Sequence, residues 1–239
     1  LRFPVSCYVK ENGFLGLVSW DTERESLFIT TKTDPEGIAA LWFRELLRKK
    51  AGTDGIRRME DYLEAHPVTL VFECVDMEHD PHVIEYPESR VILLDIVCNC
   101  MEYEKYSYEQ MRETAERLGL EHKELACVLP DWKAFADWYG QVNGKDYTYR
   151  GQQIEGFVIE DAAGRMVKLK GAYYRFWKQM RGLAREIAEK GGIDRRHVRL
   201  DAEGEAFCSW LTALYQGEGE KPEPRDICGL RRRFLEERR

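Results

Sequence analysis

Several common sequence signals are missing from this chain. No apolar run is long enough to cross a bilayer, and the sequence does not open with a signal-peptide pattern. There is no GxxxxGK(S/T) phosphate loop, no GxGxxG fingerprint, no internal repeat and no low-complexity tract. Seven scattered cysteines include no CxxC pair, so they give no zinc signature and favour reduced thiols. We therefore expect a cytoplasmic protein that does not associate with membranes.

The charge balance is acidic overall but strongly basic in one segment. With 36 basic and 43 acidic residues the net charge is −7, which argues against indiscriminate binding of nucleic acids. Between residues 162 and 185, however, seven basic residues occur without a single acid, and Tyr173, Tyr174, Phe176 and Trp177 lie among them. Such a run fits a solvated helix face, and it also fits contacts with the phosphates and bases of single strands.

The hydrophobic pattern predicts an α+β fold. A hydrophobic content of 44% over 239 residues is enough for a sizeable core. Strand-type runs and helices alternate up to residue 170, whereas helical spacing dominates the rest. We predict a principal domain over residues 1–181 and a small helical domain over 182–239. The expected strands lie on either side of residues 11–13 and at 27–32, 68–76, 82–86, 90–98 and 124–129, before a hairpin within 155–170.

The segment from Glu155 to Lys170 reads as that hairpin, with Asp161-Ala162-Ala163-Gly164 as a four-residue loop. If Glu160 pairs with Arg165, one face holds Glu155, Phe157, Ile159, Met166, Lys168 and Lys170. Burying charges is costly unless they are paired, so charges among apolar groups suggest a functional site. A cross-strand ion pair at the rim of an ordinary sheet explains the pattern equally well.

Two further charged residues stand out earlier in the chain. Lys10 ends a strand just before Asn12-Gly13, a dipeptide typical of tight turns. Glu73 lies inside the apolar strand around Phe72 and needs a partner if it is buried. Taken alone, Lys10 fits a solvated surface lysine, and Glu73 fits the solvent face of a half-buried strand.

Together these residues resemble the ordered motifs of the covalent nucleotidyltransferase superfamily of RNA ligases, DNA ligases and mRNA-capping enzymes. The motifs are Lys10-Glu11-Asn12-Gly13, Glu73, Glu155-Gly156 and Lys168-Leu169-Lys170. The chain is most similar to RNA ligases of the phage RNA ligase 1 type and to the ligase domain of fungal tRNA ligases, over about residues 1–181. The resemblance implies an antiparallel-sheet, ATP-grasp-like ligase core with flanking helices and a small C-terminal helical domain.

The resemblance also implies roles for individual residues. Lys10 would attack the α-phosphate of ATP to form a lysyl-AMP, with Lys168 and Lys170 as further catalytic residues. Glu155, with Glu73, would support Mg²⁺ or Mn²⁺, since hard oxygen ligands suit these ions. The implied nucleotide-binding residues are Lys10, Glu11, Asn12, Gly13, Lys32, Glu73, Lys168, Lys170 and Tyr174. We expect the amines of Lys10, Lys168 and Lys170 and the carboxylates of Glu73 and Glu155 to converge on one pocket.

The implied reaction seals RNA ends that carry a 5′-phosphate and a 3′-hydroxyl, as in tRNA or other RNA repair with a fused or associated end-healing kinase and phosphatase. Two alternatives stay open: a DNA ligase or capping-type enzyme, and a nucleotide- or RNA-binding module that lacks turnover or needs a partner domain. Residues 182–239 show no barrel of short strands, which disfavours the DNA ligase and capping readings. Asn12, where most relatives carry aspartate, and the nine residues before Lys10 favour weak adenylation.

Overall fold

The chain alternates strands with helices in its first part and is helical after residue 171, as the apolar pattern predicts. The computed structural model describes residues 1–80, 82–196 and 198–238. Contacts divide the chain into two compact units. Unit 1 comprises Leu1–Lys10, Pro81–Glu85 and Ala126–Arg239, and unit 2 comprises Glu11–Asp80 and Tyr86–Leu125.

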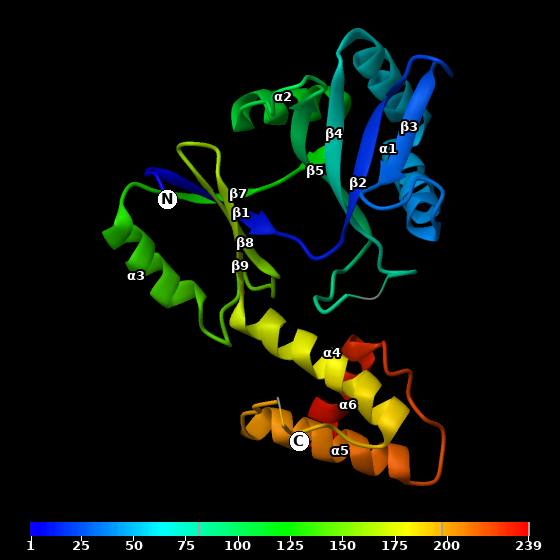
Figure 1. Ribbon diagram of the computed structural model, residues 1–239, viewed down its shortest axis with the longest axis vertical. Coiled ribbons are helices and arrows are strands. Elements are labelled where there is room, and N and C mark those ends of the chain that lie inside the picture. The colour runs from blue at the N-terminus through cyan, green and yellow to red at the C-terminus, as the bar shows by residue number, and fades with distance from the viewer. Residues whose placement is uncertain (81, 197, 239) are drawn as a thin grey trace. The chain divides into compact units, whose positions relative to one another are not determined.

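Unit 1 contains a four-stranded sheet with the order β7–β1–β8–β9 (Figure 1). β1 (Val5–Lys10) is antiparallel to β8 (Gly156–Asp161), which is antiparallel to β9 (Met166–Lys170). β7 (Leu125–Leu129) forms the opposite edge. One face of the sheet packs against α3 (Trp132–Val142) through alternating apolar side chains, so this face is the core face. Its buried members include Val5, Cys7, Val9, Phe157 and Ile159.

The helices that follow the sheet share an aromatic core. They are α4 (Ala172–Lys190), α5 (Ala202–Gln216) and α6 (Ile227–Glu236). The Trp177 ring meets Phe207 edge-on with centroids 5.6 Å apart, and Phe207 meets Phe234 in the same way at 5.2 Å. The predicted domain boundary at residue 181 falls inside α4, and separate folding of residues 182–239 stays a prediction.

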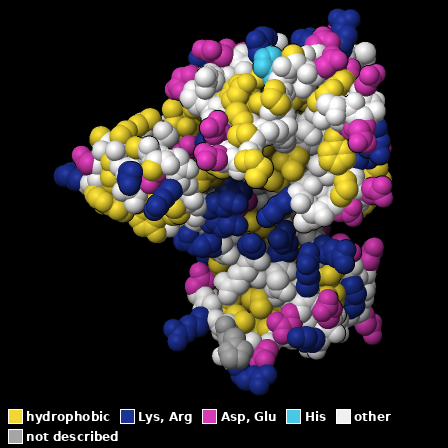
Figure 2. Space-filling model, turned by 45° about the horizontal axis from the view of Figure 1, so that its top comes forward, with side chains coloured by type: hydrophobic (Ala, Val, Ile, Leu, Met, Phe, Trp, Pro, Cys, Tyr) yellow, Lys and Arg dark blue, Asp and Glu magenta, His cyan; other side chains and the backbone are white. Residues whose placement is uncertain are grey.

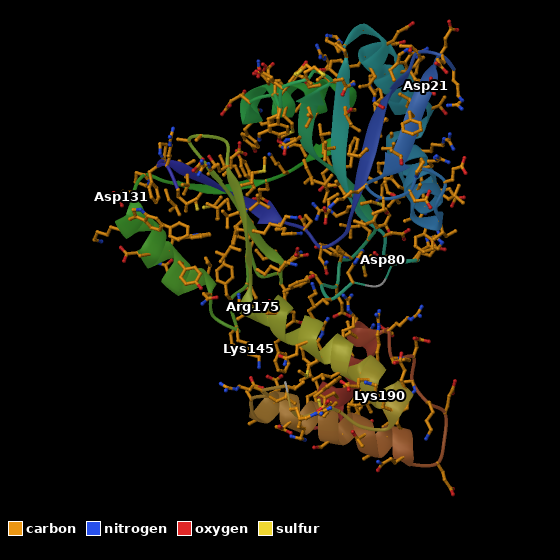
Figure 3. The ribbon with its side chains drawn as sticks, in the orientation of Figure 1. Asp21, Asp80, Asp131, Lys145, Arg175 and Lys190 are labelled. Atoms are coloured by element: carbon orange, nitrogen blue, oxygen red, sulfur yellow. The ribbon has the colours of Figure 1, made fainter. Side chains whose placement is uncertain are left out.

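The loop that precedes β8 is held by these helices. Lys145 pairs with Asp201 at 2.9 Å and with Glu203 at 2.7 Å, at the start of α5. Arg175 in α4 donates a hydrogen bond of 3.1 Å to the Asn143 side chain. Lys145 and Arg175 are labelled in Figure 3. The loop, α4 and α5 therefore position one another within unit 1.

Unit 2 contains a five-stranded sheet with the order β3–β2–β4–β5–β6. The first four strands are antiparallel to their neighbours, and the short β6 runs parallel to β5. Their bounds are Ser26–Thr31 for β3, Phe14–Asp21 for β2, Val68–Val75 for β4, Arg90–Cys98 for β5 and Glu121–His122 for β6. Phe72 and Leu70 of β4 are fully buried in its core.

Two helices complete the core of unit 2, and local sequence signals explain their ends. α1 (Ile38–Ala65) is broken at Gly52, whose φ of 64° is not helical, so it consists of two helical segments. α2 (Tyr108–Leu118) begins with a capping box formed by Ser107 and Gln110 and ends at a left-handed Gly119. Within the ranges that the structure describes, no helix is long and apolar enough to cross a membrane.

The β8–β9 hairpin forms, but its register differs from the predicted one by one residue. Gly156 pairs with Lys170, and Val158 pairs with Lys168. Because a shift of one residue moves every side chain of a strand to the other face, both lysines lie opposite the core face. The prediction that they share a face with Phe157 is wrong. The prediction that the two lysines share a face with Ile159 is wrong for the same reason.

Asp161 explains this difference in register. Its backbone N–H bonds the carbonyl of Arg165 at 2.9 Å, so these two residues close the hairpin and the loop has three residues instead of four. The Asp161 side chain accepts hydrogen bonds from the amides of Ala163, Arg165 and Arg2, at 2.9, 3.0 and 2.9 Å. Gly164 completes the loop with a φ of 76°, as three-residue hairpin loops require.

The Asn12-Gly13 dipeptide does not form the expected tight turn. Both residues have negative φ, and the strands on either side, β1 and β2, belong to different sheets. A Cβ atom on Gly13 would lie 2.2 Å from the carbonyl oxygen of Cys74. Close approach of the backbone, and not a positive φ, therefore requires glycine at this position.

The strand predicted at 82–86 is wrong, because the described part of this segment has no strand. Its buried backbone is satisfied by α6 instead. Arg231 donates to the Val83 carbonyl at 2.9 Å and pairs with Glu85 at 2.7 Å. In a sequence, an apolar run looks like a strand even where side chains, and not a neighbouring strand, bond to its backbone.

We expect Asp161→Asn to lower the melting temperature at pH 7 and the difference from wild type to narrow on acidification. Hydrogen bonds from the Arg2, Arg165 and Ala163 amides hold the pKa of Asp161 below its ordinary value, while burial opposes them. A depressed carboxyl pKa stabilises the fold above the unfolded pKa of about 4, and this stability is lost as the pH falls through the folded pKa.

Thermal unfolding of both proteins between pH 3 and pH 7 measures this difference. Asp137→Asn, at an exposed position on α3, is the control and should change the melting temperature little at any pH. A difference between Asp161→Asn and wild type that stays constant over this range would contradict the assignment.

Candidate active site

Three lysines of unit 1 lie on the face of the sheet opposite the core face. Lys10 at the end of β1 pairs with Gly156, and Gly156 pairs with Lys170 on β9. Paired residues of neighbouring strands point to the same side, so Lys10 and Lys170 flank a position without a side chain. Lys168, two residues earlier on β9, shares this face and is exposed.

The carboxylate of Glu155 fills the space between two of these lysines. Its Oε1 atom lies 3.1 Å from Lys10 Nζ and 3.0 Å from Lys170 Nζ. The side chain of Glu155 is only 3% exposed, against 14% for Lys10 and 34% for Lys170. One buried carboxylate therefore forms ion pairs with both ammonium groups.

Gly156 allows Glu155 to reach this face. In a regular strand Glu155 would share the core face with Phe157, because side chains alternate. Gly156 has a φ of 146°, which breaks the alternation, and a Cβ atom there would lie 2.0 Å from the Leu169 carbonyl oxygen. On the core face, Phe157 contacts Trp138 with ring centroids 5.0 Å apart and so fixes β8. The sequence-based grouping of Glu155 with the lysines is confirmed, although for a different reason.

Tyr174 extends the cluster into the first turns of α4. Its ring is buried, with Lys170 Nζ 4.8 Å and Lys178 Nζ 5.8 Å from the ring centre. Burial raises the pKa of Tyr174, and the charge of Glu155 adds to this effect. Burial acts to lower the pKa of Lys170, but the hydrogen bond and charge of Glu155 outweigh it, so the pKa is raised.

Unit 2 has its own polar cluster at the start of its chain segment. The backbone N–H of Gly13 donates to Glu73 Oε1 at 2.8 Å, and the N–H of Asn12 donates to the Tyr86 hydroxyl at 2.6 Å. Glu73 and Asn12 are 8% and 7% exposed. Glu73 therefore faces the Asn12-Gly13 segment and does not occupy a solvated strand face.

Two members of this unit 2 cluster, Arg90 and Tyr86, were not predicted from the sequence. Arg90 pairs with Glu11 at 3.1 Å, and its Nε donates to Glu121 at 2.9 Å. Burial would lower the pKa of Arg90, but the two carboxylates raise it above the usual range. Tyr86 is the other, and burial together with the charge of Glu11 raises its pKa. A basic residue at the first position of an apolar strand was the one available signal for Arg90.

Lys32 differs from the other predicted residues. It follows the last residue of β3, its side chain is exposed, and within the described ranges it forms no ion pair or side-chain hydrogen bond. A nucleotide contact for Lys32 stays a prediction.

The two predicted metal ligands, Glu155 and Glu73, belong to different units. Within the parts of the chain that the structure describes, no group of three or more His, Cys, Asp or Glu side chains could hold a metal. Glu155 is bound by two ammonium groups, which would repel a divalent cation at the same carboxylate. A metal site that uses Glu155 and Glu73 stays a prediction.

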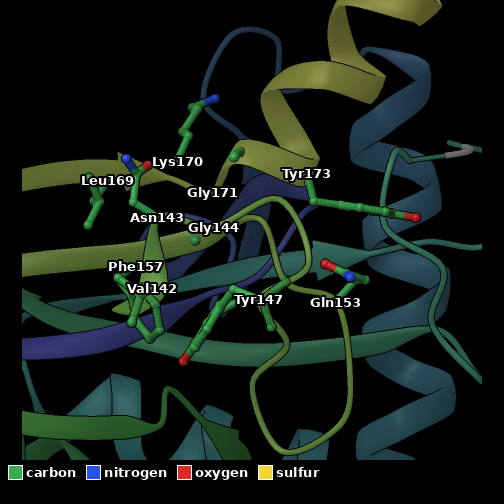
Figure 4. A pocket seen from close by; sticks show the side chains of 13 residues that line it. Val142, Asn143, Gly144, Tyr147, Gln153, Phe157, Leu169, Lys170, Gly171 and Tyr173 are labelled. Carbon is green, nitrogen blue, oxygen red and sulfur yellow. The ribbon is translucent and has the colours of Figure 1, made fainter. Parts of the chain in front are cut away.

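A small cavity lies on the core side of this region (Figure 4). It has a volume of about 10 Å³, and Phe157, Leu169, Lys170 and Tyr173 are among the residues that line it. A volume of this size holds about one water molecule, so the cavity is too small for a nucleotide.

The predicted convergence of charged groups is met within unit 1. Lys10, Glu155 and Lys170 are in direct contact, and Lys168 lies on the same face. Glu73 belongs to unit 2, and its participation in the same pocket stays a prediction.

Comparison with known proteins identifies the family. Residues 1–174 match the model of a family described as RNA ligase. No curated protein matches the chain. Among solved structures, form 2 of an archaeal ATP-dependent RNA ligase has a TM-score of 0.56 at 14% identity, and form 1 has 0.51 at 15%. A proposed ATP-dependent DNA ligase from Aquifex aeolicus has 0.51 at 14%.

Each of these alignments covers 99% of this chain but only 57%, 57% and 60% of the solved structures. The chain thus spans less than two thirds of the length of these proteins, and the likeness shows a shared fold. With 174 of 239 residues matched, the chain belongs to the RNA ligase family.

We expect Gly156→Ala to destabilise the protein by about 3 kcal/mol, because of strain at a positive φ and the clash with the Leu169 carbonyl. Urea unfolding measures the change in the free energy of unfolding. Gly182→Ala is the matched control, since a Cβ atom there meets no neighbour and alanine favours the interior of α4 by about 1 kcal/mol. Equal stability of Gly156→Ala and wild type would refute the role given to Gly156.

Proposed function

We propose that this protein is an ATP-dependent RNA ligase whose nucleophile is Lys10. One observation carries the proposal: in a chain of the RNA ligase family, Lys10 and Lys170 share the buried carboxylate of Glu155 on one sheet face. A surface lysine or a rim ion pair would not need a strained glycine to bring a buried carboxylate between two amines.

In the proposed first step, Lys10 Nζ attacks the α-phosphorus of ATP. A nitrogen–phosphorus bond forms, and the bond to the leaving pyrophosphate oxygen breaks. The ammonium group must lose its proton to become a nucleophile. Glu155 Oε1, at 3.1 Å, is within the range of a general base and is the group that we propose takes this proton. Lys168 and Lys170 offset the negative charge of the leaving pyrophosphate.

In the proposed later steps, the adenylyl group passes to the 5′-phosphate of an RNA, and a 3′-hydroxyl displaces AMP to seal the strand. Mg²⁺ or Mn²⁺ enters this scheme as part of the nucleotide substrate. From the family resemblance we extend the proposal to nucleotide contacts by Glu11, Asn12, Gly13, Lys32, Glu73 and Tyr174. A cytoplasmic role in repair of tRNA or other RNA, with an end-healing kinase and phosphatase, belongs to the same proposal.

Two alternatives give different outcomes. A DNA ligase or capping enzyme of this class usually carries a β-barrel after the catalytic core. Residues 182–196 and 198–238 contain helices and no strand. A module that binds nucleotide or RNA without turnover is the other alternative, and Asn12 favours it.

We expect incubation with α-labelled ATP and Mg²⁺ to transfer one adenylyl group to the protein, because a buried carboxylate and two lysines surround the nucleophile. Intact-mass spectrometry followed by peptide mapping should locate the adduct on Lys10. Lys10→Ala should lose the label, whereas Lys190→Ala, an exposed lysine at the end of α4, should keep it. Label that survives Lys10→Ala, or no label on wild type, would count against the proposal.

We expect sealing to require RNA with a 5′-phosphate and a 3′-hydroxyl and to use ATP in preference to GTP. The measurement follows joining of a labelled RNA strand with each nucleotide, in parallel with a nicked DNA duplex. Strands without the 5′-phosphate are the control, because they cannot accept the adenylyl group. Faster joining of DNA nicks, or use of GTP alone, would favour the other enzyme readings. RNA binding without any adduct would favour the binding module.

A further inference from the structure

Helix α4 carries a row of basic side chains that the proposed chemistry does not use. After Lys170 the helix holds Arg175, Lys178, Arg181 and Arg185 before its first acid, Glu186. At 3.6 residues per turn, Lys178, Arg181 and Arg185 fall within about 60° of one another around the axis. We call these three residues the α4 stripe.

The α4 stripe begins at the candidate active site. Tyr174 occupies the same angular sector one turn before Lys178, and its ring contacts both Lys170 and Lys178. From Tyr174 to Arg185 the helix rises about 16 Å, at about 1.5 Å per residue. Lys and Arg side chains are drawn in dark blue in Figure 2. The basic surface is therefore longer than the triphosphate of one nucleotide.

Among the described residues, no acid forms an ion pair with the α4 stripe. Within the described ranges, neither Arg181 nor Arg185 forms an ion pair or a side-chain hydrogen bond. The charge of Lys170 is the main cause that lowers the pKa of Lys178, and burial adds to it. Like charges three and four residues apart repel one another and destabilise a helix. The α4 stripe therefore lowers the stability of α4, and packing gives no reason for it.

Other basic residues of the same region behave differently. Arg175 points to another side of α4 and is bound to Asn143 and the Lys170 carbonyl. Lys190 pairs with Glu186, and Arg196 pairs with Asp194. In a chain of net charge −7, three adjacent cations that form no ion pair among the described residues make a local site for a polyanion.

We propose that the α4 stripe binds the phosphodiester backbone of an RNA strand and guides its 5′-phosphate toward Lys10 and Lys170. The inference rests on the proposed function for the identity of the polyanion. A row of cations along a helix, without exposed aromatic side chains between them, fits successive phosphates better than it fits stacked bases. The stripe therefore adds affinity without sequence preference.

The test compares two variants that each remove two positive charges. Arg181→Gln with Arg185→Gln changes the stripe, and Lys190→Gln with Arg196→Gln is the matched control at exposed, paired positions. Fluorescence anisotropy measures binding of a 5′-phosphorylated single-stranded RNA at several salt concentrations. We expect the stripe variant to bind about tenfold more weakly at low salt and its salt slope to fall by about 1.4, since each phosphate contact with a single strand contributes about 0.7.

Adenylation in the absence of RNA separates the two proposals. The stripe variant should still label Lys10 as wild type does, because the stripe lies beyond the nucleotide. Loss of labelling together with RNA affinity would mean that the stripe holds the triphosphate, and it would overturn the inference. Unchanged RNA binding, or an equal loss in the control variant, would also overturn it. If the protein binds RNA through the α4 stripe but forms no adduct with AMP, the inference about RNA binding is supported. The proposed ligase activity is then contradicted.

Discussion

The chemistry of unit 1 depends on one ionic contact, the carboxylate of Glu155 between the ammonium groups of Lys10 and Lys170. Burial of a carboxylate is tolerable only when opposite charges compensate for lost hydration. Here two cations face one anion, so the carboxylate is well compensated. The ion pairs also hold the side chains of Lys10 and Lys170 in place.

That contact has a backbone requirement as well as an electrostatic one. Lys10 and Lys170 occupy one row of three antiparallel strands, and the middle position of the row must be empty. Gly156 supplies both the empty position and the φ that turns Glu155 away from the core. Phe157 on the other face, held by Trp138, prevents β8 from rotating. The charged face is thus positioned by an aromatic core that it does not touch.

Features governed by neighbouring residues could be predicted from the sequence. The strands predicted at 68–76, 90–98 and 124–129 follow from local apolar runs and correspond to β4, β5 and β7. The basic run and the order of charged motifs were equally visible, because they need no knowledge of pairing. These signals were sufficient for the α+β class and for Lys10, Glu155 and Lys170 as a group.

Features governed by distant contacts could not be predicted. The hairpin register depends on three amide hydrogen bonds to Asp161, one of them from Arg2. The partners of Glu11 and Asn12, namely Arg90 and Tyr86, lie more than 70 residues away along the chain. The carbonyl of Cys74 leaves no room for a side chain at Gly13. The sequence does not reveal this contact, so Gly13 was predicted to be a turn residue.

The aromatic core shared by α4, α5 and α6 bears on where this chain can be shortened. The family match ends at residue 174, inside the first turn of α4. A chain cut there would lose Trp177, together with the Phe207 ring against which it packs. It would also leave Lys145 without the acids at the start of α5. The smallest fragment of unit 1 that folds should therefore extend well beyond the family match and include all three helices.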